Sequence, residues 1–364
     1  MLRRRFLGSI FSLSVFSMVL AGTALASPPK VVADIAPVHS LVAQVMEGVA
    51  TPNILIQPEA SPHGYALSPS EARALSESDL VFWMSQGLTP WMEKSLDSLA
   101  SKAHKVEMIA VEGTTTYGFR EGATFDSHDN HDDGDHDDEA HHKDEQQDNN
   151  EDEHHDRKLG WFDQLLALFS SDDHEGNTVD NQGDDHHDGH DHEGEDPHAW
   201  LDPVNAKVWV EKIRDVLVKQ DPENASKYQQ NTDRTLARLD LLIAKISQQT
   251  NSLNQLQFIV FHDAYQYFER RFGVLAAGSI SLGDAQDPSP ARVAEIRDLV
   301  KDLNITCVFS EPQYNAGLVN NVFEGTSVKT IGVMDPLGAN IKVGKGQYEQ
   351  LLNRMLGSLK QCGS

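Results

Sequence analysis

Short apolar runs alternate with amphipathic stretches in the first part of the chain. Strands are predicted at residues 30–35, 53–56 and 80–84, where apolar side chains cluster over strand length. Helices are predicted at residues 37–48 and 69–76 from the spacing of their apolar positions. Strands that alternate with helices in this way are typical of parallel βαβ units. The pattern therefore predicts an α/β domain.

The same alternation returns towards the end of the chain and predicts a second α/β domain. Strands are predicted at residues 258–261, 274–276, 306–309 and 329–333, and helices at residues 264–272, 290–302, 319–325 and from Tyr348 onward. Between the two parts, residues 225–253 contain neither Gly nor Pro and carry apolar side chains at helical spacing. A helix of about 30 residues rises roughly 45 Å, which is long enough to brace one domain against the other.

The predicted fold class is therefore α/β, with two lobes, each a mainly parallel sheet flanked by helices, joined by one long rigid helix. In an open α/β sheet, ligands bind at the carboxyl ends of the strands, so side chains at those ends can converge on a cleft. The predicted divisions are a signal peptide at residues 1–26, an N-terminal lobe at 27–221, a linking helix at 222–253 and a C-terminal lobe at 254–364.

The first 26 residues have the composition of an export signal. Three arginines at positions 3–5 precede an apolar core at residues 6–20, and Ala24-Leu25-Ala26 forms a small-residue cleavage site. Thr23 stands where a lipid-anchored bacterial protein would have Cys. We therefore expect a soluble protein without a membrane anchor, exported to the periplasm by the Sec or the twin-arginine route.

Residues 126–197 depart from globular composition. They hold 12 of the 17 histidines and 27 of the 56 acidic residues, so they carry most of the formal net charge of −26. We expect a disordered, acidic, His-rich insert in the N-terminal lobe, interrupted by an apolar segment at residues 159–169. A solvated linker is one interpretation, but imidazole and carboxylate together suit borderline metals such as Zn²⁺, which favours metal capture. Outside the insert the charge is nearly balanced, which argues against nucleic acid as a partner.

The chain has only two cysteines, Cys307 and Cys362. In an oxidising, exported location the default expectation is a disulfide between them, which would tie the C-terminal helix to the strand that contains Cys307. A pair of Cys metal ligands is the alternative.

Three histidines outside the insert each lie at a predicted strand-to-helix junction. They are His63 in Ser-Pro-His-Gly-Tyr, His198 in Asp-Pro-His-Ala-Trp, and His262 in Phe-His-Asp-Ala-Tyr. Side chains at such junctions can converge, and three imidazoles with one oxygen, from Asp335 or from water, form the tetrahedral shell that Zn²⁺ favours. Each histidine alone could equally be structural, and Asp335 could cap a turn.

Two further acids near these junctions have less specific interpretations. Asp263 could support its neighbour His262 as a metal ligand, but the favoured expectation is that it caps the following helix; Glu311 is a weaker candidate for lining the cleft. His39 and His104 are expected to be ordinary helix or surface residues.

Four motifs in this order resemble the metal-specific family of periplasmic solute-binding proteins, and within it the ZnuA-type receptors of bacterial zinc ABC importers. They are residues 60–65, residues 196–203, residues 261–265 and residues 335–338, and the similarity runs from Lys30 to the C-terminus. The resemblance implies two α/β lobes joined by a long helix, with the metal between the lobes. It also implies that His63, His198 and His262 are ligands. Gly64 replaces an Asp that is common in the family, and Pro62 stands where some zinc members have Glu, which leaves the fourth ligand open between Asp335 and water.

The resemblance implies a receptor that captures Zn²⁺ and delivers it to an inner-membrane zinc ABC permease. An auxiliary periplasmic zinc chaperone is a further candidate partner, and we expect a monomer. A periplasmic zinc buffer that acts mainly through the insert is the alternative function. A zinc hydrolase is disfavoured because the chain has no His-Glu-x-x-His motif and no evident general base beside the ligands. We therefore predict that the protein is not an enzyme.

Overall fold

The computed structural model describes residues 27–120, 125, 194–281, 289–303, 305, 307–314, 316–326 and 328–363. The predicted signal peptide, the apolar segment at 159–169 and nearly all of the His-rich insert lie outside these residues. The described residues on both sides of positions 127–192 belong to one compact unit. Among the helices of the described part, none is both long and apolar enough to cross a bilayer.

The first sheet has four parallel strands in the order β2-β1-β3-β4. Its two inner strands, β1 and β3, are buried at every position, as expected for a sheet covered on both faces. The strands are β1 (Val31–Ala33), β2 (Asn53–Ile54), β3 (Leu80–Trp83) and β4 (His104–Glu107), and the helices are α1 (Ala36–Val45), α2 (Pro69–Ser76) and α3 (Met92–Leu99).

The second sheet repeats this topology with the order β6-β5-β7-β8, again fully parallel. Its inner strands β5 and β7 therefore correspond to β1 and β3. The strands are β5 (Phe258–His262), β6 (Gly278–Ser281), β7 (Cys307–Ser310) and β8 (Lys329–Val333), and the helices are α7 (Gln266–Phe272), α8 (Pro290–Asp302), α9 (Ala316–Phe323) and α10 (Gln347–Cys362). The two predicted α/β units are confirmed.

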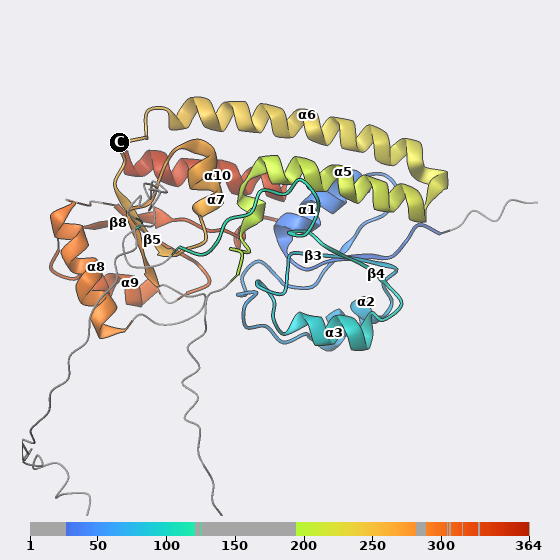
Figure 1. Ribbon diagram of the computed structural model, residues 1–364, viewed down its shortest axis with the longest axis horizontal. Helices are drawn as coiled ribbons and strands as arrows, with labels where there is room; N and C mark the ends of the chain where they lie inside the picture. Colours follow the sequence, from blue (N-terminus) through green and yellow to red (C-terminus); the bar gives the residue numbers. More distant parts are fainter. Residues whose placement is uncertain are drawn as a thin grey trace, which may run out of the picture. The chain divides into compact units, whose positions relative to one another are not determined.

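Two helices lead from the first sheet to the second. After the 3-10 turn η1 (Ala199–Leu201), α5 runs over Pro203–Gln220, and a second short turn, η2 (Pro222–Asn224), precedes α6 (Ala225–Thr250). With 26 residues, α6 is about 39 Å long. It packs against α5, α1 and α10, and the first two of these helices belong to the part of the chain before η2 (Figure 1).

Helix starts follow local sequence signals. Ser68 caps α2 in a reciprocal capping box with Glu71, and Asp202 caps α5 by accepting the backbone N–H of Val204. In both helices Pro occupies the first turn, where its missing N–H costs nothing. These two caps flank the segments that carry His63 and His198, so they help to fix where those segments end.

One hydrophobic core runs through both halves of the compact unit. It extends from β1 and β3 through α5 and α6 to α10 and one side of the second sheet. A smaller cluster lies between the second sheet and helices α8 and α9. The C-terminal helix thus belongs to the second half by chain order but packs on α1 of the first.

The predicted strand at residues 274–276 is wrong. The chain leaves α7 through Gly273, which adopts a left-handed conformation, and Leu275 is 57% exposed. The strand that pairs with β5 is Gly278–Ser281, whose glycine and serines gave no apolar signal. Helix α3 and strand β4 were not predicted.

The two cysteines form a disulfide, as expected. Cys307 begins β7 and Cys362 ends α10, and their Cα atoms lie 5.8 Å apart. The bond ties the C-terminal helix to the strand that leads to Glu311, and the alternative of a Cys metal pair is set aside.

Candidate metal centre

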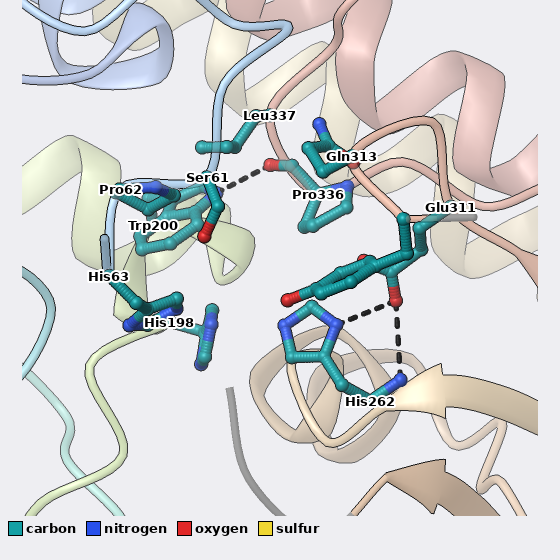
Figure 2. A pocket seen from close by; sticks show the side chains of 11 residues that line it. Ser61, Pro62, His63, His198, Trp200, His262, Glu311, Gln313, Pro336 and Leu337 are labelled. Atoms are coloured by element: carbon teal, nitrogen blue, oxygen red, sulfur yellow. Dashed lines mark hydrogen bonds and ion pairs between the residues drawn. The ribbon is translucent and has the colours of Figure 1, made fainter. Parts of the chain in front are cut away.

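Three separate parts of the chain bring His63, His198 and His262 together. His63 lies in the loop between β2 and α2, His198 directly precedes η1, and His262 is the last residue of β5. One nitrogen of each ring can be chosen so that the three atoms all lie within 4.8 Å of one another. Figure 2 shows the three imidazoles pointing towards a common space. Such a spacing suits a single bound metal ion, because metal–nitrogen bonds of about 2 Å place ligand atoms roughly 3–4 Å apart.

A carboxylate orients the ring of His198. Asp196 Oδ1 accepts hydrogen bonds from the backbone N–H of His198 at 2.9 Å and from its Nδ1 at 2.7 Å. Both side chains are buried. Because a carboxylate accepts hydrogen bonds, the proton sits on Nδ1, and the lone pair of Nε2 is left for a metal.

His262 is held in the same manner from a different strand. Glu311, the residue after β7, accepts from Nδ1 of His262 at 2.7 Å and from its backbone N–H at 3.3 Å (Figure 2). This carboxylate is also buried. Two of the three imidazoles therefore have the same tautomer imposed on them by a buried acid, an arrangement that recurs around protein-bound zinc.

The loop of His63 is fixed by a backbone contact. The indole Nε1 of Trp91 donates to the carbonyl of Pro62 at 2.8 Å, directly before His63. The His63 and His198 ring centroids are 5.8 Å apart, and those of His198 and His262 are 5.3 Å apart. His63 is half-buried, so it is the most exposed of the three.

The three histidines line one pocket, whose empty volume is about 250 Å³ including the part open to solvent. The remaining walls are Ser61, Pro62, Trp200, Glu311, Gln313, Tyr314, Pro336 and Leu337. Trp200 crosses from one half to the other by donating to the carbonyl of Pro336 at 2.8 Å. Three imidazoles that converge in one pocket form a donor set that can hold a metal ion.

Asp335 lies near the pocket, and its side chain accepts hydrogen bonds from the backbone of the turn that follows it. Its Oδ1 accepts from the backbone N–H groups of Leu337 and Gly338 and from Gln313 Nε2, and its Oδ2 accepts from the N–H of Ala339. Among the described residues, the cluster with metal-ligand spacing contains the three histidines and not Asp335. The predicted role of Asp335 as fourth ligand stays a prediction, while the turn-capping role is present in the structure.

Asp263 is not the helix cap that we expected. Tyr265 occupies the N-cap position of α7, and Asp263 instead accepts from Arg120 Nε at 2.9 Å. Arg120 also donates through Nη1 to Glu269 at 2.7 Å. Burial raises the pKa of the Asp263 carboxyl, and the hydrogen bond from Arg120 opposes that rise. Arg120 and Asp263 lie 143 positions apart in the chain, so no local sequence pattern could predict this ion pair.

The sequence pattern did not indicate how two acids beside the histidines act. Glu311 was expected only as a weak lining residue, yet it directs His262. Asp196 was placed inside the insert, although it is buried and fixes His198. The Asp-x-His spacing was a usable signal for Asp196, since a side chain two residues earlier can reach both the N–H and the ring of the histidine.

Two α/β halves of like topology, connected through a long helix, with three imidazoles gathered from two loops and the end of β5, define a two-lobed metal-binding protein. The family model of the periplasmic zinc-uptake complex component A, ZnuA, matches residues 31–362. The chain therefore belongs to the ZnuA family.

Individual relatives agree with this family. The chain is 38% identical over 357 residues to the high-affinity zinc uptake system protein ZnuA of Brucella abortus (strain 2308), covering 98% of each chain. It is 34% identical over 353 residues to the protein of the same name from Paracoccus denitrificans (strain Pd 1222), covering 95% of this chain and 97% of the relative.

Solved structures share the fold. A crystal structure of ZnuA has a TM-score of 0.63 at 18% identity, covering 91% of this chain and 99% of that chain. The periplasmic zinc binding protein TroA from Treponema pallidum has a TM-score of 0.66 at 15% identity, covering 91% and 98%. At these identities the likeness shows the architecture alone.

Proposed function

We propose that this protein is a periplasmic zinc receptor that binds one Zn²⁺ between its two lobes and delivers it to an inner-membrane ABC permease. The observation that carries the proposal is the group of three imidazoles, two of them held through Nδ1 by buried carboxylates. Family membership and the zinc uptake named for the relatives support the same conclusion.

The proposed ligands are Nε2 atoms of His198 and His262 together with His63. Asp335 would have to give up hydrogen bonds from backbone N–H groups to join them. We therefore assign the fourth position to water, with Asp335 as the competing ligand. An exchangeable fourth ligand suits a receptor, because cargo must leave as well as bind.

His63 and His198 lie in the part of the chain before η2, and His262 lies in the part after α6. A movement of one half against the other would therefore remove at least one ligand, which offers a route to release at the permease. An auxiliary zinc chaperone as a donor partner, and a monomeric state, are parts of the same proposal. Catalysis is not part of it.

Calorimetric titration of Zn²⁺ tests the proposal. The key variant lacks residues 127–192, so that Asp196 remains in place. Gly118 and Glu195 pair with each other, so a short Gly-Ser linker can close the gap. We expect one tight site in this variant, absent when His63, His198 and His262 are all changed to Ala.

A matched control changes His39 and His104 to Ala in the same deletion variant. Neither residue lines the pocket, so the tight site should persist. If the deletion variant lacks a tight site while the intact chain binds several ions, the three-histidine assignment fails. The main function would then be zinc buffering through the His-rich insert.

A further inference from the structure

One buried glutamine connects the segment of His198 to the helix that follows His262. Gln266 is the first residue of α7 and is 1% exposed. Its Nε2 donates to Asp196 Oδ2 at 3.1 Å and to the backbone carbonyl of Gly118 at 3.0 Å. Both partner atoms are acceptors, so the side-chain amide must present its nitrogen to them. The orientation of the amide therefore follows from the chemistry of its neighbours.

Asp196 forms the middle of a chain of hydrogen bonds. Its Oδ1 accepts from the backbone and the Nδ1 of His198, and its Oδ2 accepts from Gln266. The backbone carbonyl of Asp196 accepts from the hydroxyl of Tyr267 at 2.7 Å, and that hydroxyl accepts from the N–H of Tyr117 at 3.1 Å. Two adjacent residues of α7 thus hold the side chain and the main chain of Asp196.

We propose that Gln266 is a positioning residue for the bound metal. It fixes the Asp196 carboxylate and, through it, the direction in which His198 presents Nε2, and it does so from the helix that begins one turn after His262. The proposal rests on the proposed function, because it assumes that His198 and His262 bind the same ion.

The physical reason is the geometry that zinc demands. Ligand atoms must lie within a few tenths of an ångström of their ideal distances, and supporting residues must hold them there before the ion arrives. His198 precedes η1 and His262 lies after α6, so local chain geometry does not set their separation. The hydrogen bonds that join Asp196 to α7 help to set it, because α7 and His262 are neighbours in sequence.

The same amide also fixes a second chain segment. Gly118, whose carbonyl Gln266 binds, forms an antiparallel bridge with Glu195, the residue before Asp196. Gln266 therefore contacts both of the chain segments that form this bridge. Loss of its donor would leave Asp196 Oδ2 buried with an unmet hydrogen bond and would loosen the bridge at the same time.

The test compares two substitutions of Gln266 in the full mature chain. Gln266→Met keeps the length and removes the donor, and Gln266→Glu places an oxygen against two acceptors. For each variant we would measure the Kd for Zn²⁺ by chelator competition and the rate of zinc release. We would also record the visible absorption spectrum with one equivalent of Co²⁺, which reports ligand geometry. Gln44→Met is the control, because Gln44 is equally buried on α1 and does not line the pocket.

We expect Gln266→Met to weaken Zn²⁺ binding about 10-fold, the lower end for residues that support metal ligands. Gln266→Glu should weaken it further, with faster release and an altered Co²⁺ spectrum for both. Gln44→Met should change none of these, even if it lowers the melting temperature. If the methionine variant does not fold, Gln266→Asn replaces it, since its amide is one methylene too short to reach both acceptors.

A parental Kd and Co²⁺ spectrum in a folded Gln266 variant would overturn the proposal and leave the receptor function intact. Absence of a tight site in the parent chain itself would instead reject the proposed function. The two failures are therefore distinguishable in one set of titrations.

Discussion

The two sheets have the same strand order, yet their equivalent inner junctions are used in different ways. In the first sheet, Asp34 follows β1 and accepts backbone N–H groups from Ile35 and from Met84, the residue after β3, each at 2.7 Å. In the second, His262 ends β5 and donates to Glu311, the residue after β7. In both junctions a buried carboxylate spans the two inner strands.

The difference lies in what the carboxylate holds. Among the described residues, the groups that donate to Asp34 are main-chain N–H groups, so the junction of the first sheet is closed by its own backbone. Glu311 binds a side chain whose other nitrogen is turned towards the pocket. A strand-end position therefore permits a binding site without specifying one, and the residue at the end of the first inner strand decides between a structural and a binding role.

The largest expected effect concerns the closed junction. Burial raises the pKa of Asp34 from 3.8 to about 7. Between these values the unfolded chain carries an ionised Asp34 while the folded protein keeps the proton. The contribution to stability is therefore fully present below pH 3.8 and is lost as the pH rises through about 7. The loss approaches about 4 kcal/mol, since each pKa unit is worth about 1.4 kcal/mol.

Urea unfolding of the metal-free protein and of Asp34→Asn, at several pH values from 4 to 8, measures this loss. The stability of the variant relative to the parent should rise across that range, because the amide does not titrate. Other groups cancel in the difference. A difference that stays constant with pH would show that Asp34 is ionised in the folded protein at all these values. Zinc affinity should remain at the parental value, because Asp34 does not line the pocket.

The open junction should respond in binding. Glu311→Gln keeps an oxygen that can accept from His262 Nδ1 but removes the charge that makes the imidazole a stronger ligand. We expect Zn²⁺ to bind about 10-fold more weakly, which corresponds to about 1.4 kcal/mol. Competition with a chelator measures the change, and Glu295→Gln on the exposed surface of α8 is the control. Unchanged affinity would mean that Glu311 only stabilises the fold, as Asp34 does.

Local signals explain which parts of this architecture could be predicted from the sequence. Helices α2 and α8 begin at Ser-Pro caps and were predicted with their observed bounds. Strand β6 was misplaced because Gly278 and Ser279 are small, and burial of a small residue leaves no apolar signal. For the site, the motifs at predicted strand-to-helix junctions identified the three histidines, which the structure brings together. Glu311 lies 49 residues from its partner His262, and only the strand order places them side by side.

The smallest expected effect concerns Asp335 and tests whether this carboxylate is structural or binds the metal. It follows β8 and resembles Asp34, because both of its oxygens accept main-chain N–H groups. If it is a structural carboxylate, Asp335→Asn should change the Zn²⁺ affinity less than about 3-fold, well below the change expected for a residue that holds a metal ligand in place. The amide would turn a donor towards one of the N–H groups, so the free energy of unfolding should fall by about 1 kcal/mol. Calorimetry and urea unfolding on the same preparation separate the two effects. A loss of affinity above 100-fold would make Asp335 the fourth ligand. The end of β8 would then be a second place where the sheet of the second half uses a carboxylate for binding rather than for its own backbone.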